Sequence, residues 1–300
     1  SKNFGINNIE IKDLEIPEEI KTKYLLISGG IEGVSIEKEV SKTPLKYGVS
    51  KDLEKQIYEN SNREIKFTFR SPKEQIEKLT FELNNENKNL IENIEIVANK
   101  NAKVTFIITY MSCEDEDGFH NGLVRVVANE NSKVDVIIVN LLNNNSNSFF
   151  SMENTIYDNA TVNYYIVDFG GKTSVTNYFS NLLGNDSKSN LNTIYLGTEN
   201  QLFDINYIAE LNGKRADANI EVQGALNDYA KKNFKGTIDF KKGCKKAKGT
   251  ENEFCILLSD TARSKALPML LCTEEDVEGA HSSAAGKIDE EMIFYIMSRG

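Results

Sequence analysis

The middle of this chain repeats itself about every 29 residues. Residues 98–108 (ANKNAKVTFII) recur almost unchanged at residues 128–138 (ANENSKVDVII), and a looser copy, DNATVNYYIV, occupies residues 158–167. Segments of alternating apolar and polar residues continue at spacings of 28 to 30 residues, with matching anchors at Val104, Val134, Val162, Leu191, Ile220 and Thr250. Because alternation with a period of two residues is typical of β-strands, the repeat unit is built from strands.

A fixed period of this length in an all-strand region favours a solenoid, in which each coil stacks on the next and buries a shared interior. The parallel β-helix fits best, and a β-sandwich or other antiparallel array is the alternative. Asn-rich and Gly-rich turns separate the strand-like runs, and the four prolines all fall outside residues 73–267. A strand core without proline keeps its hydrogen-bond ladders uninterrupted. The chain is therefore expected to be all-β.

The flanks of the repeat differ from its middle, so three regions are expected. Residues 1–90 form a mixed N-terminal region, with strand-like KYLLISGG and REIKFTFR and helix-like SKDLEKQIYEN. Residues 91–273 form the β-helix core. Residues 274–300 begin a C-terminal helical region, because the apolar residues of KIDEEMIFYIMSR recur at helical spacing, as Ile288, Met292, Ile293 and Ile296 do.

Charge and composition narrow the classes of partner. The chain has 35 basic and 45 acidic side chains and a formal net charge of -10, which argues against nucleic acid or an anionic membrane as a partner. No apolar run approaches the roughly 20 residues needed to cross a bilayer, and the start lacks the apolar core of a signal peptide. We therefore expect a cytoplasmic protein. Its four cysteines contain no CxxC pair, so neither a zinc ribbon nor a thioredoxin motif is expected.

Four short motifs could carry chemistry, and each has a simpler interpretation. FGGKTS at residues 169–174 contains GKT, but Ile166 stands where a phosphate-binding loop needs glycine, so no bound nucleotide is expected. The lysines around Cys244 would make a reactive thiolate, although an exposed solubilising turn is favoured. CEDEDGFH at residues 113–120 has metal-ligand types, but a solvated acidic turn is favoured. Cys255 lies in a strand-like run and is expected to be buried and inert.

One of the two histidines, His281, lies among small residues just before the C-terminal helix-like segment, in DVEGAHSSAAGKIDEEMIFYIMSRG. The sequence contains neither GxSxG nor HExxH, so a serine hydrolase or a histidine-rich zinc enzyme is not expected. A β-helix enzyme acting on acidic sugars would need acidic and basic side chains converging on one coil face, and no such repeated register is visible. His281 is therefore the best single candidate residue.

The C-terminal stretch resembles the signature of the SufB/SufD family, scaffold components of the SUF system for iron-sulfur cluster assembly. Residues 234–268 also resemble the sequence that precedes this signature in the family. Before residue 230 the likeness rests on the architecture alone. The residues that match the family pattern in register are Pro268, Asp276, Val277, His281, Ala284, Gly286, Ile288, Asp289, Glu290, Phe294, Tyr295, Ser298, Arg299 and Gly300.

The resemblance implies a right-handed parallel β-helix with a C-terminal helical region, which agrees with the repeat. It implies a non-enzymatic scaffold that works with a SufC-like ABC-type ATPase, as a homodimer or as a heterodimer with a related SufB or SufD chain. A transient iron-sulfur cluster would then be the cargo. His281 would lie where two scaffold chains meet, either as an iron ligand or as a purely structural residue of that contact. Because family members continue beyond the SRG motif, we expect this chain to be a short or truncated form.

Departures from the family pattern leave a different class open. The scaffold cysteine that SufB proteins carry before the proline has no counterpart near Ala262, and Gly279 replaces a cysteine common two residues before the histidine. Cys272 lies nearby but replaces an apolar family position, which favours core packing over a role as a cluster ligand. The missing thiols keep open a β-helix interaction or assembly protein without cluster chemistry. A carbohydrate-active β-helix enzyme is a more distant alternative.

Overall fold

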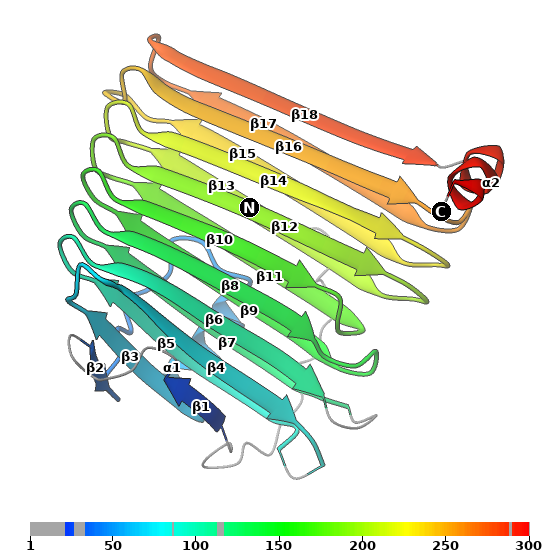
Figure 1. The fold of residues 1–300 in the computed structure, drawn as a ribbon, viewed down its shortest axis with the longest axis horizontal. Coiled ribbons are helices and arrows are strands. Elements are labelled where there is room, and N and C mark those ends of the chain that lie inside the picture. The colour runs from blue at the N-terminus through cyan, green and yellow to red at the C-terminus, as the bar shows by residue number, and fades with distance from the viewer. Residues whose placement is uncertain (1–21, 27–33, 86, 113–116, 288–289, 300) are drawn as a thin grey trace.

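The computed structural model describes residues 22–26, 34–85, 87–112, 117–287 and 290–299. In this part of the chain it is a parallel β-solenoid of about 8 turns with a short C-terminal helix, which confirms the expected fold (Figure 1). The described strands form two nine-stranded sheets. Sheet A contains β1, β4 and the even-numbered strands from β6 to β18, and sheet B contains β2 and the odd-numbered strands from β3 to β17. Only β1 and β2 pair antiparallel to their neighbours among the described strands.

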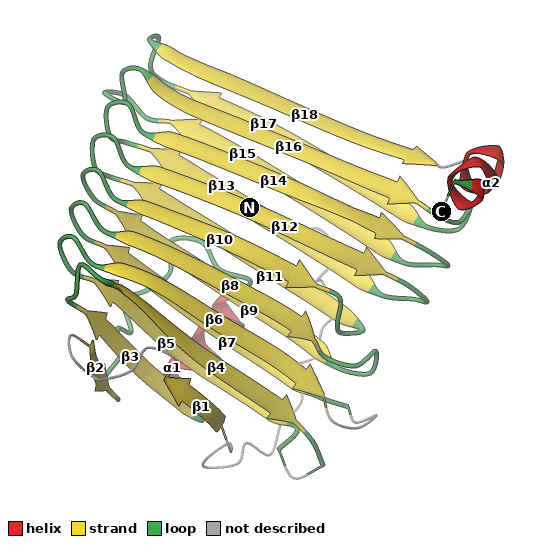
Figure 2. Ribbon diagram, in the orientation of Figure 1, coloured by secondary structure: helices red, strands yellow, loops and turns green. Residues whose placement is uncertain are grey.

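Each coil contributes one strand to each sheet, and coils stack with their strands in register (Figure 2). The elements are β1 (Thr22–Leu26), β2 (Val34–Glu37), α1 (Lys51–Asn60), β3 (Arg63–Phe69), β4 (Glu74–Leu83), β5 (Asn89–Ala98), β6 (Lys103–Ser112), β7 (Phe119–Ala128), β8 (Lys133–Leu141), β9 (Asn147–Ile156), β10 (Thr161–Asp168), β11 (Thr173–Leu182), β12 (Lys188–Gly197), β13 (Leu202–Leu211), β14 (Asp217–Leu226), β15 (Lys231–Phe240), β16 (Ala247–Leu257), β17 (Arg263–Cys272), β18 (Val277–Lys287) and α2 (Glu290–Ser298).

The parallel strands extend beyond the expected core at both ends, from β3 to β18. Both stretches expected to be helical form helices, α1 and α2. Strand β18 precedes α2 within the region expected to begin the C-terminal helices. How the chain divides into domains stays a prediction. No helix among the described residues is long and apolar enough to cross a membrane.

Inward-pointing side chains form columns along the axis of the solenoid, because residues in register on parallel strands face the same side of a sheet. These columns make up the core. Val104, Val134 and Val162 stack as the repeat predicts, and Leu191 stacks on Ile220. Two steps of the series are displaced, the one from Val162 to Leu191 and the one from Ile220 to Thr250. Leu191 pairs with Tyr164 rather than Val162, two residues further on and on the same face.

The prediction for Thr250 is wrong by one residue. Thr250 pairs with Asn219, so the residue that follows Ile220 in the inner column is Glu251. The cause lies in the turn before this strand, because the Lys-rich turn at residues 241–246 is longer than the equivalent turn at residues 212–216. A slip of one residue moves every side chain to the other face of a strand. Because of the longer turn, the side chain that points into the solenoid is the carboxyl group of Glu251 rather than the hydroxyl group of Thr250.

A segment near the N-terminus lies across the outer face of sheet B. Helix α1 begins at the Ser50 cap, whose side chain accepts a hydrogen bond from the Leu53 backbone N–H. Leu53 and Ile57 are buried against apolar side chains of the sheet. Before the helix, the Ser41 carbonyl accepts from Arg125 on β7 at 2.7 Å, and Lys46 forms an ion pair with Glu210 on β13 at 2.5 Å.

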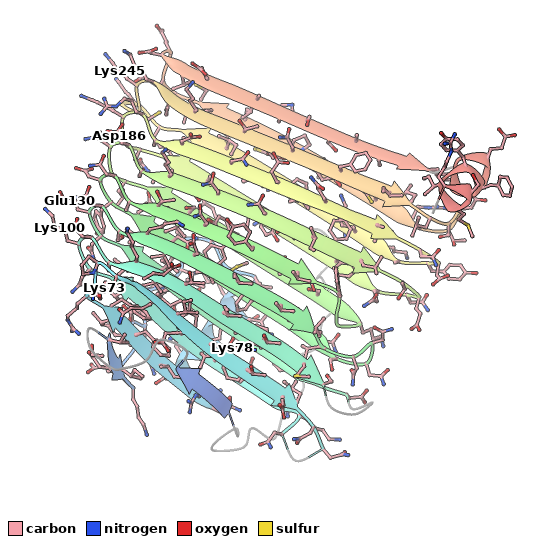
Figure 3. All side chains as sticks on the ribbon, viewed as in Figure 1. Lys73, Lys78, Lys100, Glu130, Asp186 and Lys245 are labelled. Carbon is pink, nitrogen blue, oxygen red and sulfur yellow. The ribbon has the colours of Figure 1, made fainter. Side chains whose placement is uncertain are left out.

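One corner of the coil repeats a left-handed backbone residue on every turn. Asn101, Asn131 and Asn159 have φ of 66°, 58° and 56°, and Asp186, Arg215 and Lys246 continue the series. Asparagine tolerates this conformation better than most residues, which explains the Asn-rich turns in the repeats. Each of these six residues donates its N–H to a carbonyl of the next coil. The labelled side chains of Lys100, Glu130, Asp186 and Lys245 mark this rim in Figure 3.

Candidate functional site

His281 lies on β18, the last strand of sheet A, at the C-terminal end of the solenoid. Its side chain is exposed, and no hydrogen bond or ion pair within the described residues engages the imidazole. The next two side chains fasten the strand, because Ser282 donates to Asn252 Oδ1 at 2.6 Å and Ser283 donates to Glu253 Oε2 at 2.7 Å. The histidine is therefore held on an anchored strand with its ring free to bind.

Cys272 lies at the end of β17, the last strand of sheet B. It pairs in register with Phe240 and is exposed, and its Sγ donates to the Glu274 carbonyl at 2.8 Å. Within the described residues no group of three or more His, Cys, Asp or Glu side chains could hold a metal ion. Cys272 is exposed, so the favoured interpretation of core packing is wrong for it. His281 and Cys272 occupy the same end of the molecule without forming a complete metal centre among the described residues, and their part in cluster binding stays a prediction.

Glu251 lies directly beneath His281, since the two residues are in register on β16 and β18. Its side chain is 0% exposed, and neither carboxylate oxygen has a hydrogen-bond partner within the part of the chain that the structure describes. Burial, with a smaller contribution from Glu253, raises the pKa of Glu251 to about 7. The carboxylate lies against the backbone of Gly236, where a Cβ atom would come within 2.2 Å of it.

The neighbouring Glu253 is also buried but has a full set of partners. Lys232 of β15 donates to Glu253 Oε1 across the interior, and both side chains are 0% exposed. Ser283 of the last strand donates to the other carboxylate oxygen at 2.7 Å. The interior beneath the last coil therefore contains one neutralised carboxylate and one carboxylate without a partner. Neither carboxylate was identified as buried from the sequence. A signal was present for the partner of Glu253, because Lys232 shares the period-two positions of apolar residues in KKNFKGTIDF, which indicates that this lysine points inward.

Cys244 and Cys255 both lie in the core. The sequence predicted a buried position for Cys255 but an exposed turn for Cys244. Cys244 is 0% exposed, and burial raises the pKa of its thiol. Both the favoured interpretation, an exposed turn, and the alternative of an activated thiolate are therefore wrong for Cys244. The turn bends so that its cysteine packs inward while the adjacent lysines remain outside. Cys255 is also 0% exposed, which confirms that it is buried.

The acidic stretch at residues 113–120 lies partly outside the described residues, since Cys113 and the three residues after it are not described. At its end, His120 points into the solenoid. Its Nδ1 lies 2.9 Å from Ser148 Oγ, and its Nε2 lies 3.2 Å from Glu92 Oε1, which also accepts from the Tyr110 hydroxyl. These side chains are buried in the core, so His120 belongs to an interior polar network rather than to a surface loop.

Asp168 belongs to another interior network. Burial raises its pKa to about 6, although hydrogen bonds from Ser174 Oγ at 2.6 Å and Asn140 Nδ2 at 2.8 Å act in the opposite direction. The folded protein therefore binds this proton more tightly than the unfolded chain, whose aspartates have a pKa of about 3.9. Ionisation of Asp168 accordingly lowers stability as the pH rises from about 4 to above 6.

Asp168→Asn removes this ionisation and keeps both polar positions, because Ser174 Oγ can accept from the new amide. We expect the variant to be more stable than the wild type by about 2 to 3 kcal/mol at pH 7.5, at 1.36 kcal/mol per pKa unit. The gain should vanish near pH 4. Urea unfolding of both proteins at the two pH values measures it. A gain that is the same at both pH values would mean that the Asp168 charge is not its source.

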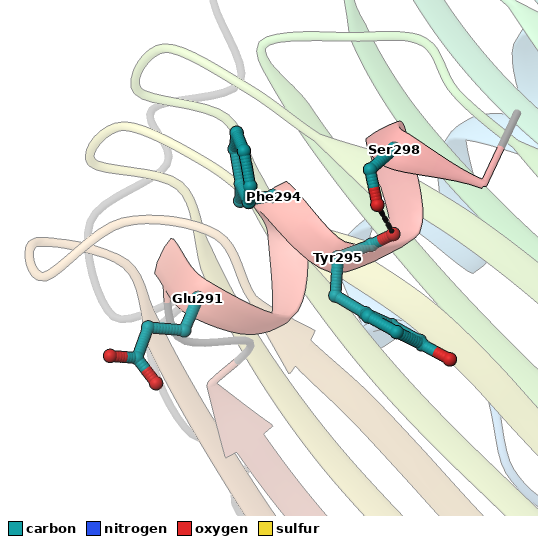
Figure 4. Close-up of a pocket in the computed structure, with 4 residues that line it drawn as sticks. All are labelled: Glu291, Phe294, Tyr295 and Ser298. Carbon is teal, nitrogen blue, oxygen red and sulfur yellow. Dashed lines mark hydrogen bonds between the residues drawn. The ribbon is translucent and has the colours of Figure 1, made fainter.

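Helix α2 follows the last strand and presents apolar side chains to solvent. Phe294 and Met297 are each 75% exposed, and Tyr295 is 55% exposed. Figure 4 shows Glu291, Phe294, Tyr295 and Ser298 around a shallow depression, with the Ser298 hydroxyl donating to the Tyr295 carbonyl at 2.7 Å. Among the described residues, the end of the solenoid thus combines open strand edges, an imidazole and a buried carboxylate that have no partner, and a helix with exposed apolar side chains.

Comparison with known proteins identifies relatives that match most of the chain. A family model described as "SUF system FeS cluster assembly, SufBD core domain" matches residues 81–300. The chain is 24% identical over 217 residues to iron-sulfur cluster assembly protein SufD of Bacillus subtilis, which covers 70% of this chain and 49% of that protein.

Two further relatives are also named as iron-sulfur cluster assembly proteins. An iron-sulfur cluster assembly SufBD family protein of Pyrococcus horikoshii is 31% identical over 132 residues, covering 43% of this chain and 28% of that protein. SufD of Escherichia coli is 24% identical over 155 residues, covering 52% of this chain and 37% of that protein. The chain therefore spans about half or less of the length of these relatives.

Proposed function

Because the chain belongs to the family of the SufBD core domain of the SUF system for FeS cluster assembly, we propose that it is a non-enzymatic scaffold subunit on which iron-sulfur clusters are assembled. The observation that carries this proposal is the position of His281, exposed and without a partner among the described residues, on the last strand of the matched region. A neutral imidazole nitrogen is a good ligand for iron. The cluster is the transient cargo of the scaffold.

The proposed partners are a second scaffold chain and a SufC-like ABC-type ATPase, acting in the cytoplasm. Open strand edges invite pairing with another chain, and β17 carries exposed apolar side chains at Leu267, Met269 and Leu271. The second chain is either another copy or a related SufB or SufD protein. The exposed apolar residues of α2 support a docking surface for the ATPase beside this end. ATP turnover then belongs to the partner.

The experiment is anaerobic reconstitution with ferrous iron and sulfide, with and without the ATPase. His281→Ala is expected to retain roughly tenfold less iron and sulfide than the wild type, since even the loss of a residue that only supports a metal ligand weakens binding by this factor. Because the side chain is exposed, its loss should change the free energy of unfolding by less than about 0.5 kcal/mol. Light scattering checks that the oligomeric state is unchanged.

Cys272→Ser is the matched control for His281→Ala. A thiol ligand would show the same loss of iron and sulfide, whereas a packing residue would leave the cluster content unchanged. A second function, that of a β-helix interaction protein without cluster chemistry, is favoured by the missing thiols. Wild-type protein that takes up no iron or sulfide, even with the ATPase present, would contradict the scaffold proposal and favour this second function.

A further inference from the structure

The inner column of sheet A that ends at His281 changes character at its last two positions. The column includes the buried Glu77 on β4, and its members from β6 to β14 are aromatic or aliphatic and stack in register from one coil to the next: Phe106, Val136, Tyr164, Leu191 and Ile220. The column then continues with Glu251 and ends at His281. Two ligand-type side chains therefore follow one another at the open C-terminal end of the column, after five apolar positions in a row.

A buried carboxylate without a partner destabilises a fold unless a cation or a proton neutralises it. Among the described residues, no Lys or Arg pairs with Glu251, and the buried Lys232 is bonded to Glu253 instead. The absence of a side chain at Gly236 leaves the space that the Glu251 carboxylate occupies. A cation that enters from outside the chain, at the end where His281 is exposed, would neutralise this carboxylate when it carries no proton.

We propose that Glu251 and His281 of one chain together bind a ferrous ion at the end of the solenoid, before sulfide arrives. This inference rests on the proposed function and adds to it a second iron ligand, from the coil beneath the histidine. Adjacent parallel strands lie about 4.8 Å apart, so side chains in register can reach one ion between them. Imidazole nitrogen and carboxylate oxygen together form a donor set that suits Fe(II).

One chain supplies only part of the coordination sphere. The described residues contain no group of three or more His, Cys, Asp or Glu side chains suited to a metal. Water fills the remaining positions when iron binds alone, and sulfide or a ligand from a second scaffold chain replaces it during assembly. An incomplete sphere of this kind allows the ion to be released, as the cargo of a scaffold must be.

The test is anaerobic titration of the wild-type chain with ferrous iron in the absence of sulfide, with Co(II) as a spectroscopic probe of the same site. We expect Glu251→Gln and His281→Ala each to weaken binding at least tenfold and to change the visible absorption of bound Co(II). Glu251→Gln keeps the shape of the side chain, so its fold should be intact by circular dichroism.

Glu278→Gln is the matched control. Glu278 lies on the same strand as His281, carries the same charge as Glu251, and is exposed in an ion pair with Lys248 at 2.8 Å. Its replacement should change iron affinity less than twofold. Equal weakening by Glu278→Gln and Glu251→Gln would reveal general electrostatic attraction and overturn the proposal.

Two other results separate this inference from the proposed function. If Glu251→Gln binds ferrous iron as tightly as the wild type while His281→Ala does not, Glu251 is not a ligand and the scaffold proposal stands. If the wild type binds no ferrous iron alone yet is reconstituted with iron and sulfide, the ion does not bind first. That result also overturns the inference and leaves the scaffold function intact. Failure of both iron binding and reconstitution contradicts both.

Discussion

Lys232→Met is expected to lower the free energy of unfolding by about 3 to 5 kcal/mol, because it leaves the charge of Glu253 buried and unpaired. Both members of this ion pair are 0% exposed and lie on strands of opposite sheets. Ser283 remains as the only other donor to the Glu253 carboxylate among the described residues. Urea unfolding followed by circular dichroism measures the loss.

The double variant Lys232→Met/Glu253→Gln is the control for this prediction. Removing both charges should restore most of the lost stability, because neutral replacements of similar volume are tolerated where a lone charge is not. A double variant as unstable as Lys232→Met would show that lost packing of the lysine, rather than an unpaired carboxylate, causes the effect.

Gly213→Ala is expected to destabilise the fold by about 3 kcal/mol or more, as clashes in a close-packed interior do. A Cβ atom at this position would lie 1.8 Å from the Gly184 carbonyl oxygen in the coil beneath. The obstacle is backbone that also forms part of the stacked corner, so no side-chain rotation can relieve it. The two coils would have to separate, which breaks hydrogen bonds between neighbouring corners.

Gly286→Ala provides the comparison for Gly213→Ala, because no atom of the described residues other than its chain neighbours lies within 4 Å of a Cβ built at Gly286. Its effect should stay within about 0.5 kcal/mol. Thermal unfolding of the two variants and the wild type under one set of conditions tests the difference. Equal midpoints for the two alanine variants would show that the coils can separate at little cost.

The repeat in the sequence was sufficient to predict the solenoid, because apolar anchors such as Val104 and Val134 recur wherever coils of equal length stack. Helix α1 was predictable for a similar reason, since its cap and apolar face are local in sequence. The buried carboxylate of Glu251 was not predictable. It depends on the extra length of one turn, and a periodic pattern gives the average length of a coil rather than the length of each turn.

The candidate site was predicted only in part. His281 could be identified from the residues that follow it, and the structure places it on an exposed edge strand. Its neighbours could not be found in this way, because Lys232 and Glu253 meet across the interior from different coils. In the sequence, Lys232 follows another lysine and resembles a solvated residue. Only the register of the coils distinguishes the exposed Lys231 from the buried Lys232.

The segment that crosses the outside of sheet B divides the solenoid into coils that it contacts and later coils that it does not contact. From Ser41 to Lys46 and Tyr47, it contacts side chains of β5, β7, β9, β11 and β13. Opening a coil in that part must also detach the segment, so a change that destabilises one of those coils destabilises the others as well. The last coils are held mainly by their neighbours, and local opening is least costly there. His281 and Glu251 thus lie in the part of the fold that can rearrange around a cargo while the rest stays folded.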